Sequence, residues 1–244
     1  YVNEVPERAK KLIKHFWPGP LTIILFVKEG TLPDAVTGGL PTAAFRCPDD
    51  EMTHDLISEL GKPIVGPSAN TSTKPSPTTA EHVYHDLKGK IAGIIDNGPT
   101  EIGLESTIVD LSVETPTVLR PGEITPEEIS KVLGEEVLMN KGTTQTKGVP
   151  KAPGMKYRHY APSAPVFIVD KEADFSKIKW DKETGVAALD EVLDKIDSSN
   201  KYSLGKTIDK AATYSVLSDT LIAKIILSVF MCKVLIMEQL VLHI

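Results

Sequence analysis

The chain has 244 residues, of which 41% are hydrophobic and 25% are charged, and its formal net charge is −6 at pH 7. This composition is typical of a folded globular protein with one large or two modest domains, and the negative charge argues against a general nucleic-acid coat protein. Two distant cysteines, Cys47 and Cys232, provide neither a disulfide framework nor a zinc cluster, so we expect a cytoplasmic protein.

Residues 1–138 predict an α/β domain. Apolar positions at helical spacing, together with capping residues, predict helices over 6–16, 50–60, 78–87 and 125–133. In the second of these, Met52, Leu56, Ile57 and Leu60 are expected to face inward. The spacing of Thr78 and Glu81 suggests a capping box at the start of the third. The fourth begins at Thr125-Pro126-Glu127-Glu128 and ends at Gly134.

Short apolar, β-favouring runs predict the strands of this domain. They lie at 21–27, 42–46, 63–66, 91–95 and 107–111. Helices and strands do not alternate strictly along the chain, so we expect a mixed sheet rather than a purely parallel one.

A second, smaller α/β domain is predicted over 165–244, after a linker over 139–164. Residues 140–151 are polar and contain almost no apolar side chain, which is typical of a linker. Strands are expected at 166–169 and 186–189 and a helix near Thr207. The final run, 221–244, is apolar but is interrupted by Lys224, Lys233 and Glu238, so we interpret it as a buried or aberrant tail and not a membrane span.

The segment 153–162 combines basic and aromatic residues between prolines. Proline disfavours helix for the residue before it, so this strap is expected to be extended. An extended segment that carries Tyr157, Arg158, His159 and Tyr160 suits a ligand with a negative charge and a flat face, such as a nucleotide. A solvated linker is the alternative.

Hydroxyls, small residues and arginines gather where short strands end. Ligands of α/β sheets bind near such ends, and these groups suit phosphates and carboxylates. The candidates are Thr42, Arg46, Gly66, Ser68, Asn70, Ser76, Ser106, Thr107 and Arg120. Each has a plainer alternative as a turn former, a cap or a surface ion pair. Arg46 and Arg120 follow apolar stretches, however, and a partly buried arginine needs an anion.

Other catalytic motifs are weak. His82 and His85 are three apart on a predicted helix, but no cysteine or acidic cluster completes a metal site, and we predict none. Glu105 is a candidate base without a second carboxylate nearby in sequence. Neither a P-loop nor a dinucleotide fingerprint occurs.

Taken together, six segments resemble the YrdC-like family, specifically its long, two-domain threonylcarbamoyl-AMP synthases. They are residues 18–22, 46–48, 66–70, 105–110, 119–122 and 153–162, in this order. The resemblance covers about residues 6–170. It implies a twisted mixed sheet with helices and a smaller Rossmann-like carboxy-terminal domain.

The resemblance also implies a reaction. L-Threonine, bicarbonate and ATP would give threonylcarbamoyl-AMP and pyrophosphate, and a downstream transferase complex would pass the threonylcarbamoyl group to tRNA. Mg²⁺ would be carried by the phosphates. No protein nucleophile is needed.

Residue roles follow from the same resemblance. Arg46, Gly66 and Ser106 would hold threonine. ATP or the adenylate would contact Thr42, Ser68, Ser76, Ser106, Arg120 and Tyr157. Asn70, Thr107, His159 and Tyr160 are further candidates.

Two departures from the family pattern accompany the resemblance. The family's early Lys-x-Arg and Ser-x-Lys motifs, which bind ATP phosphates, have no counterpart before Trp17, and the chain opens without methionine. We therefore expect a catalytic domain truncated at its amino terminus, whose own activity is left open. From about residue 218 the sequence leaves the family pattern, and an out-of-frame continuation is our hypothesis for this tail.

Two alternative functions remain open at this point. One is a YrdC-like module that binds double-stranded RNA or nucleotides without catalysis, although the net charge weighs against it. The other is an enzyme that forms a carbamoyl-adenylate for a different acceptor. No membrane association is expected.

Overall fold

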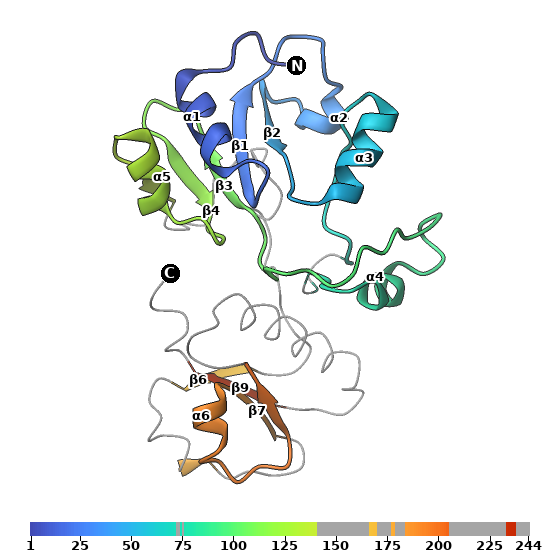
Figure 1. The fold of residues 1–244 in the computed structure, drawn as a ribbon, viewed down its shortest axis with the longest axis vertical. Coiled ribbons are helices and arrows are strands. Elements are labelled where there is room, and N and C mark those ends of the chain that lie inside the picture. Colours follow the sequence, from blue (N-terminus) through green and yellow to red (C-terminus); the bar gives the residue numbers. More distant parts are fainter. Residues whose placement is uncertain are drawn as a thin grey trace. The chain divides into compact units, whose positions relative to one another are not determined.

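The computed structural model describes residues 1–71, 74, 76–140, 166–169, 177–178, 184–204 and 233–237 (Figure 1). The chain forms two compact units, one from Tyr1–Pro67 with Glu105–Tyr157 and the other from Ser68–Leu104 with Arg158–Ile244. The predicted strap, with Tyr157, His159 and Tyr160, and the helix expected near Thr207 lie outside the described residues.

The first unit contains a five-stranded mixed sheet in the order β2-β1-β3-β4-β5. Its strands are β1 (Leu21–Phe26), β2 (Thr42–Arg46), β3 (Thr107–Asp110), β4 (Thr117–Arg120) and β5 (Leu138–Met139). β1 runs antiparallel to β2 and parallel to β3, while β3 and β4 are antiparallel and β4 and β5 are parallel. The expectation of a mixed sheet is therefore confirmed.

Two helices, α1 (Glu7–Phe16) and α5 (Pro126–Leu133), cover one face of this sheet (Figure 1). Their buried side chains meet every second residue of the strands, as the two-residue period of a strand requires. The core consists of Ala9, Leu12, Leu21, Ile23, Leu25, Val109, Leu111, Val118, Ile124, Ile129 and Leu133. On the opposite face, the described residues form a small apolar cluster of Ile24 and Ile108 with Leu119. That second face is where polar side chains collect.

Local capping chemistry explains where the helices of this unit begin and end. α5 starts with a capping box, in which the Thr125 hydroxyl accepts from the Glu128 amide and the Glu128 carboxylate accepts from the Thr125 amide. α3 (Glu51–Leu60) is capped by the Asp50 carboxylate and ends at Gly61, whose φ of 64° favours glycine. The short α2 spans Asp34–Thr37.

Four expectations about the elements between β2 and β3 are wrong. Residues 63–66 and 91–95 are not strands. α3 has no buried residue, and its apolar positions Met52, Leu56 and Leu60 are exposed. Thr79, not Thr78, caps α4 (Ala80–Leu87) by accepting from the His82 amide. Strands need hydrogen bonds from another segment, and the described residues offer these two runs no neighbouring strand.

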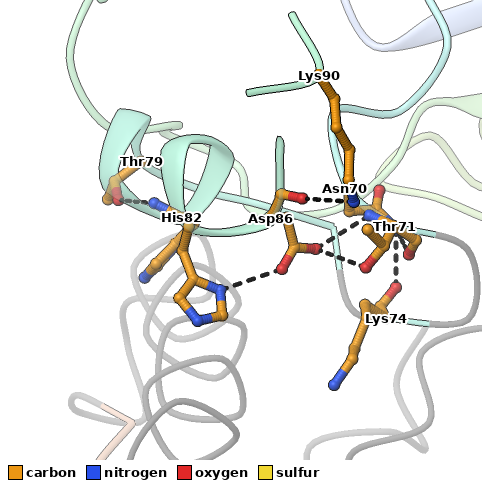
Figure 2. A network of polar contacts seen from close by, with 8 residues as sticks. Asn70, Thr71, Lys74, Thr79, His82, Asp86 and Lys90 are labelled. Carbon is orange, nitrogen blue, oxygen red and sulfur yellow. Dashed lines mark hydrogen bonds and ion pairs between the residues drawn. The ribbon is translucent and has the colours of Figure 1, made fainter. Parts of the chain in front are cut away.

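In the second unit, Asp86 on α4 organises a polar network (Figure 2). Its carboxylate accepts from the amide of Thr71 at 3.0 Å and from the Thr71 hydroxyl at 3.1 Å. The Asn70 amide group donates to the carbonyls of Thr71 and Lys74. Burial raises the pKa of Asp86, but hydrogen bonds from Thr71 and His85 outweigh it, and the net pKa lies below the ordinary value.

The remaining strands of the second unit form a sheet in the order β6-β9-β7-β8, in which every neighbouring pair is parallel. The strands are β6 (Val166–Val169), β7 (Thr184–Ala188), β8 (Lys201–Ser203) and β9 (Lys233–Met237). The helix α6 (Asp190–Leu193) contributes Val192 and Leu193 to a small core with β7. β9 places part of the expected tail between β6 and β7. Among the described residues, no helix is long and apolar enough to cross a membrane.

Candidate functional site

Four polar side chains form a row across one end of the first sheet, on the face opposite α1 and α5. Thr22 on β1 is the Cα partner of Arg46 on β2, and residues opposite each other on antiparallel strands point to the same face. The Thr22 hydroxyl is 2.7 Å from the hydroxyl of Ser106, which directly precedes β3. The Ser106 hydroxyl in turn accepts from Arg120, the last residue of β4, at 3.0 Å. Strands β2, β1 and β4 and the residue directly before β3 therefore contribute one side chain each.

Arg120 is held firmly by its neighbours. Its Nη1 donates to the Glu105 carboxylate at 2.7 Å, and its Nε and Nη2 donate to the Ser106 carbonyl at 3.0 and 2.8 Å. Both side chains of this ion pair are mostly buried, with 19% and 23% of their surfaces accessible. The positive charge of Arg120 is therefore compensated by Glu105. The same hydrogen bonds fix the orientation of the planar Arg120 guanidinium.

Arg46 differs from Arg120 because it has no such partner. Within the part of the chain that the structure describes, its guanidinium makes no hydrogen bond or ion pair. The residue lies exposed at the end of β2, yet partial desolvation of its guanidinium lowers its pKa, and the nearby charge of Arg120 lowers it further against the opposing effect of Glu105. Arginine stays protonated in proteins, so an uncompensated cation faces this end of the sheet.

A close backbone approach fixes the two segments that carry Ser106 and Arg120. A Cβ on Gly122 would lie 2.4 Å from the Glu105 carbonyl oxygen and 2.6 Å from the Thr107 nitrogen. Only glycine fits this contact. The Thr107 hydroxyl donates to the Ile124 carbonyl at 2.7 Å and is completely buried, so its side chain serves this connection.

Two other candidates of the first unit, Thr42 and Gly66, make no hydrogen bond to the row among the described contacts. Thr42 is buried at the opposite end of β2, paired with Phe26. It shares the face of Arg46 but is separated from it by four residues, about 13 Å at the usual rise of a strand. Gly66 is exposed, and a Cβ there would meet nothing within 4 Å. Its backbone is therefore accessible to a ligand.

Three further candidates belong to the second unit. Ser68 is exposed, and Asn70 and Ser76 are half-buried. The side-chain oxygen of Asn70, Oδ1, is buried and has no hydrogen-bond partner among the described residues, whereas its Nδ2 donates to the Thr71 and Lys74 carbonyls (Figure 2). The Asn70 side chain thus connects the backbone at Thr71 and Lys74.

The row does not fit a metal held by protein ligands. Among the described residues, no group of three or more histidine, cysteine or acidic side chains lies close enough to bind an ion. The row itself consists of two arginines and two hydroxyl groups, and the neighbouring Glu105 carboxylate is already paired with Arg120. Such a set binds anions.

Sequence reasoning did not assign a role to Thr22 or to the ion pair of Glu105. Thr22 is the single hydroxyl in an otherwise apolar run, and a polar residue at an alternate position of a buried strand is a usable signal. The pairing of Glu105 with Arg120 joins residues 15 apart in sequence and depends on the β3–β4 register.

The first half of the chain matches a known protein family. A family profile described as "Telomere recombination", that of Sua5, YciO and YrdC, matches residues 1–122. The chain belongs to the Sua5/YciO/YrdC family. A second profile, described as the carboxy-terminal domain of threonylcarbamoyl-AMP synthase, matches residues 124–222 of this Sua5/YciO/YrdC member. The two matches follow one another along the chain, in agreement with a two-domain organisation.

Curated relatives of this family member carry one name. The threonylcarbamoyl-AMP synthase of Bacillus subtilis is 53% identical over 165 residues, which are 68% of this chain and 47% of the relative. That of Pyrococcus abyssi is 45% identical over 218 residues, which are 86% of this chain and 63% of the relative. The chain thus spans about half to two thirds of the length of these relatives.

A solved structure confirms the fold of the Sua5/YciO/YrdC member. The crystal structure of P. abyssi Sua5 complexed with L-threonine has a TM-score of 0.82 and 39% sequence identity, and the match covers 97% of this chain and 70% of that one. The twisted mixed sheet with helices is accordingly the family fold.

Proposed function

We propose that this protein is an L-threonylcarbamoyladenylate synthase that uses L-threonine, bicarbonate and ATP. The observation that carries the proposal is the row of Arg46, Thr22, Ser106 and Arg120 at one end of the first sheet, in which Arg46 is a cation that has no hydrogen-bond or ion-pair partner among the described residues. Relatives named for this activity and a related structure complexed with L-threonine support it.

The reaction makes modest chemical demands on the protein. The amine of threonine and bicarbonate give a carbamate and water. A carbamate oxygen then attacks the α-phosphorus of ATP, a new P–O bond forms, and the bond to the β-phosphate oxygen breaks as pyrophosphate leaves. Such a transfer depends mainly on positioning and on charge neutralisation, which guanidinium and hydroxyl groups provide.

Three residues of the row have a ligand-binding role in this proposal. Arg46 pairs with the threonine carboxylate, because its planar guanidinium can make two parallel hydrogen bonds and uses none of them on the described residues. Ser106 contacts threonine and the adenylate, and Arg120 contacts the adenylate from its fixed position. The open backbone of Gly66 allows threonine to approach closely.

The remaining candidates keep their proposed roles toward the nucleotide. These are Thr42, Ser68, Ser76 and Tyr157, with Asn70, Thr107, His159 and Tyr160 as secondary candidates. Mg²⁺ would arrive with the ATP phosphates, in line with an anion-binding row. The product would pass to a transferase complex that modifies tRNA, in the cytoplasm.

The activity is tested by pyrophosphate release from ATP, measured with and without L-threonine and bicarbonate. Release that requires both compounds supports the proposal. Release that is independent of threonine refutes the amino-acid specificity, and RNA binding that weakens steeply with salt and ignores ATP would indicate a binding module instead.

The role of Arg46 has its own test, in which L-threonine binding is measured by calorimetry. Arg46→Ala removes a charge-assisted contact of about 1.5–3 kcal/mol and should weaken threonine binding by roughly 10- to 150-fold. Arg46→Lys keeps the charge but loses the fork and should recover only part of the affinity. ATP binding should survive in both variants. Equal loss of ATP and threonine binding would contradict the assignment.

A further inference from the structure

The turn that follows β2 is anchored at two consecutive residues, directly beside Arg46. The Cys47 carbonyl accepts a hydrogen bond from the Gly19 amide at 2.8 Å. The Pro48 carbonyl oxygen lies 2.6 Å from Nε2 of His54, a half-buried residue of α3. Arg46, the last residue of β2, is therefore followed at once by two carbonyls with hydrogen-bond partners.

The acceptor decides the direction of the contact between His54 and Pro48. A carbonyl oxygen carries no hydrogen and can only accept, so Nε2 of His54 must carry a hydrogen and donate it. The Nε2–H tautomer of the neutral ring and the imidazolium ion both meet this condition. The Nδ1–H tautomer does not, because two lone pairs would then face each other at 2.6 Å. The protonation of Nε2 thus follows from the ligand-free contact alone.

The same hydrogen excludes another role for His54, that of a base for a cysteine nucleophile. Sγ of Cys47 lies 3.6 Å from Nε2 of His54. A base would need a lone pair on this nitrogen to accept the thiol proton, and the hydrogen donated to Pro48 occupies that position. His54 therefore acts on the turn through its N–H group and not on the thiol through a lone pair.

His54 also connects α3 to the end of β2. α3 has no buried residue, so apolar burial contributes little to its attachment. Among the residues that the structure describes, His54 is the one α3 side chain that forms a hydrogen bond to the turn. The Asp50 carboxylate caps the helix by accepting from the Thr53 amide at 2.7 Å, and only Asp49 separates this cap from Pro48. The turn is thus short and held by polar contacts.

We infer that His54 is a positioning residue for Arg46. Its Nε2–H group holds the Pro48 carbonyl, and the anchored turn sets the direction in which the Arg46 guanidinium leaves the sheet. His54 does not touch the ligand. Two parallel hydrogen bonds to a carboxylate require a fixed orientation of the planar guanidinium, so a looser turn weakens carboxylate binding. The identity of that carboxylate, the one of threonine, rests on the proposed function.

The matched variants His54→Leu and His54→Gln separate the hydrogen-bond donor from the helix that carries it. Leucine and glutamine are both good helix formers, so α3 should persist in each variant. Leucine has no donor, whereas the side-chain amide of glutamine donates and cannot act as a base. A result shared by histidine and glutamine but not by leucine therefore reports on the donated hydrogen bond.

Two measurements use the ligand-free protein. Nitrogen-15 NMR of the His54 ring should show a hydrogen on Nε2, and the Nδ1–H tautomer would overturn the inference. Exchange of the Gly19 amide with solvent, which reports on the Cys47 carbonyl, should become about two- to tenfold faster in His54→Leu and return to the wild-type rate in His54→Gln. The control is the Gly134 amide, which donates to the Ser130 carbonyl at the end of α5 and should be unaffected. An unchanged Gly19 rate in His54→Leu overturns the inference.

The third measurement is affinity for L-threonine, determined by NMR titration with and without Arg46→Ala. His54→Leu should weaken binding by about two- to tenfold, and His54→Gln should restore most of it. In the Arg46→Ala background, His54→Leu should cause no further loss, because the guanidinium that it positions is absent.

The outcomes of the titration separate positioning from a general effect on the fold. An equal loss with and without Arg46, or an unaltered affinity of His54→Leu in a protein whose wild type binds L-threonine, overturns the inference. A wild-type protein that does not bind L-threonine would remove the proposed function. The ring-nitrogen and amide-exchange measurements would then still decide whether His54 holds the turn beside Arg46.

Discussion

Gly122 lies where the loop after β4 crosses the start of β3, and the substitution Gly122→Ala should destabilise the first unit. The added Cβ would lie 2.4 Å from the Glu105 carbonyl oxygen, 2.6 Å from the Thr107 nitrogen and 2.8 Å from the Thr107 hydroxyl. Two of these atoms belong to the backbone, so no rotamer change relieves the contact. The start of β3 must move.

The size of the effect follows from two contributions. Forcing an extra carbon into a filled space costs about 1–3 kcal/mol. Moving Thr107 also endangers the buried hydrogen bond from its hydroxyl to the Ile124 carbonyl, worth about 1 kcal/mol. The free energy of unfolding should therefore fall by about 2–4 kcal/mol, a large part of the roughly 5–15 kcal/mol of a typical domain.

Urea unfolding followed by tryptophan fluorescence measures this change. Trp17, whose Nε1 donates to the Leu21 carbonyl at 2.7 Å, reports on the first unit when Trp180 is replaced by phenylalanine. With a slope of about 2 kcal/mol per molar urea, the midpoint should fall by about 1–2 M. The matched control is Gly66→Ala, because a Cβ at Gly66 meets nothing within 4 Å, and its midpoint should barely move.

If Gly122→Ala unfolds at the same urea concentration as the wild type with the same slope, the close approach of the two segments is wrong. An equal loss in Gly66→Ala would point to a general effect of losing glycine instead. Either result would also weaken the geometry from which the placement of Ser106 and Arg120 was argued.

Two further predictions concern capping and pH. Thr125→Ala removes half of the α5 capping box and should cost about 0.5–2 kcal/mol in the same urea assay, whereas Thr125→Ser should cost little. The pKa of Asp86 lies below its ordinary value, so its stabilising bonds are complete above the ordinary range and are lost as the pH falls through the lower, folded-state pKa. The Thr71 amide NMR shift should therefore titrate below pH 3.8, and Asp86→Asn should abolish that titration. A titration midpoint above 3.8 would contradict the direction of the shift.

The sequence predicted the parts of the fold that depend on local chemistry. The capping residues of α3 and α5 and the apolar face of α1 act within a few positions of the chain, and these helices appear where expected. The strands at 21–27, 42–46 and 107–111 also appear, within a residue or two at their ends. In the strands at 21–27 and 107–111, alternate residues (Leu21, Ile23, Leu25, Val109 and Leu111) are buried on the α1–α5 side.

The local sequence pattern was insufficient for strands and helix faces whose structure depends on another segment of the chain. The runs at 63–66 and 91–95 have strand-like composition, but β structure requires a neighbour in register, which no short window of sequence contains. The apolar face of α3 was misjudged for the same reason, since Met52, Leu56 and Leu60 form a good helical stripe that the described residues leave exposed. Apolar residues at helical spacing predict that a helix forms more reliably than they predict which segment packs against its apolar face.

For the candidate site, residue types in the sequence indicated which side chains to consider, but they did not indicate which side chains pair with one another. Arg46, Ser106 and Arg120 were singled out because hydroxyls and arginines at strand ends suit anions. Arg120 forms an ion pair with Glu105, whereas Arg46 has no ion-pair partner among the described residues, and this difference depends on side-chain geometry across the β3–β4 register. Thr22 belongs to the matched segment 18–22, but nothing near it in sequence indicates that its hydroxyl lies beside that of Ser106, 84 positions away.

The position of β2 has a consequence for how this sheet responds to its ligand. Among the described strands, β2 is outermost and pairs only with β1, and edge elements separate from a sheet more readily than central ones. An anion bound by Arg46 on β2 and by groups at the ends of β3 and β4 would connect these strands across β1. Binding of the ligand would then stabilise the edge strand β2 against local separation from the sheet. The Arg46 guanidinium would thus contribute both to ligand recognition and to the stability of the sheet edge.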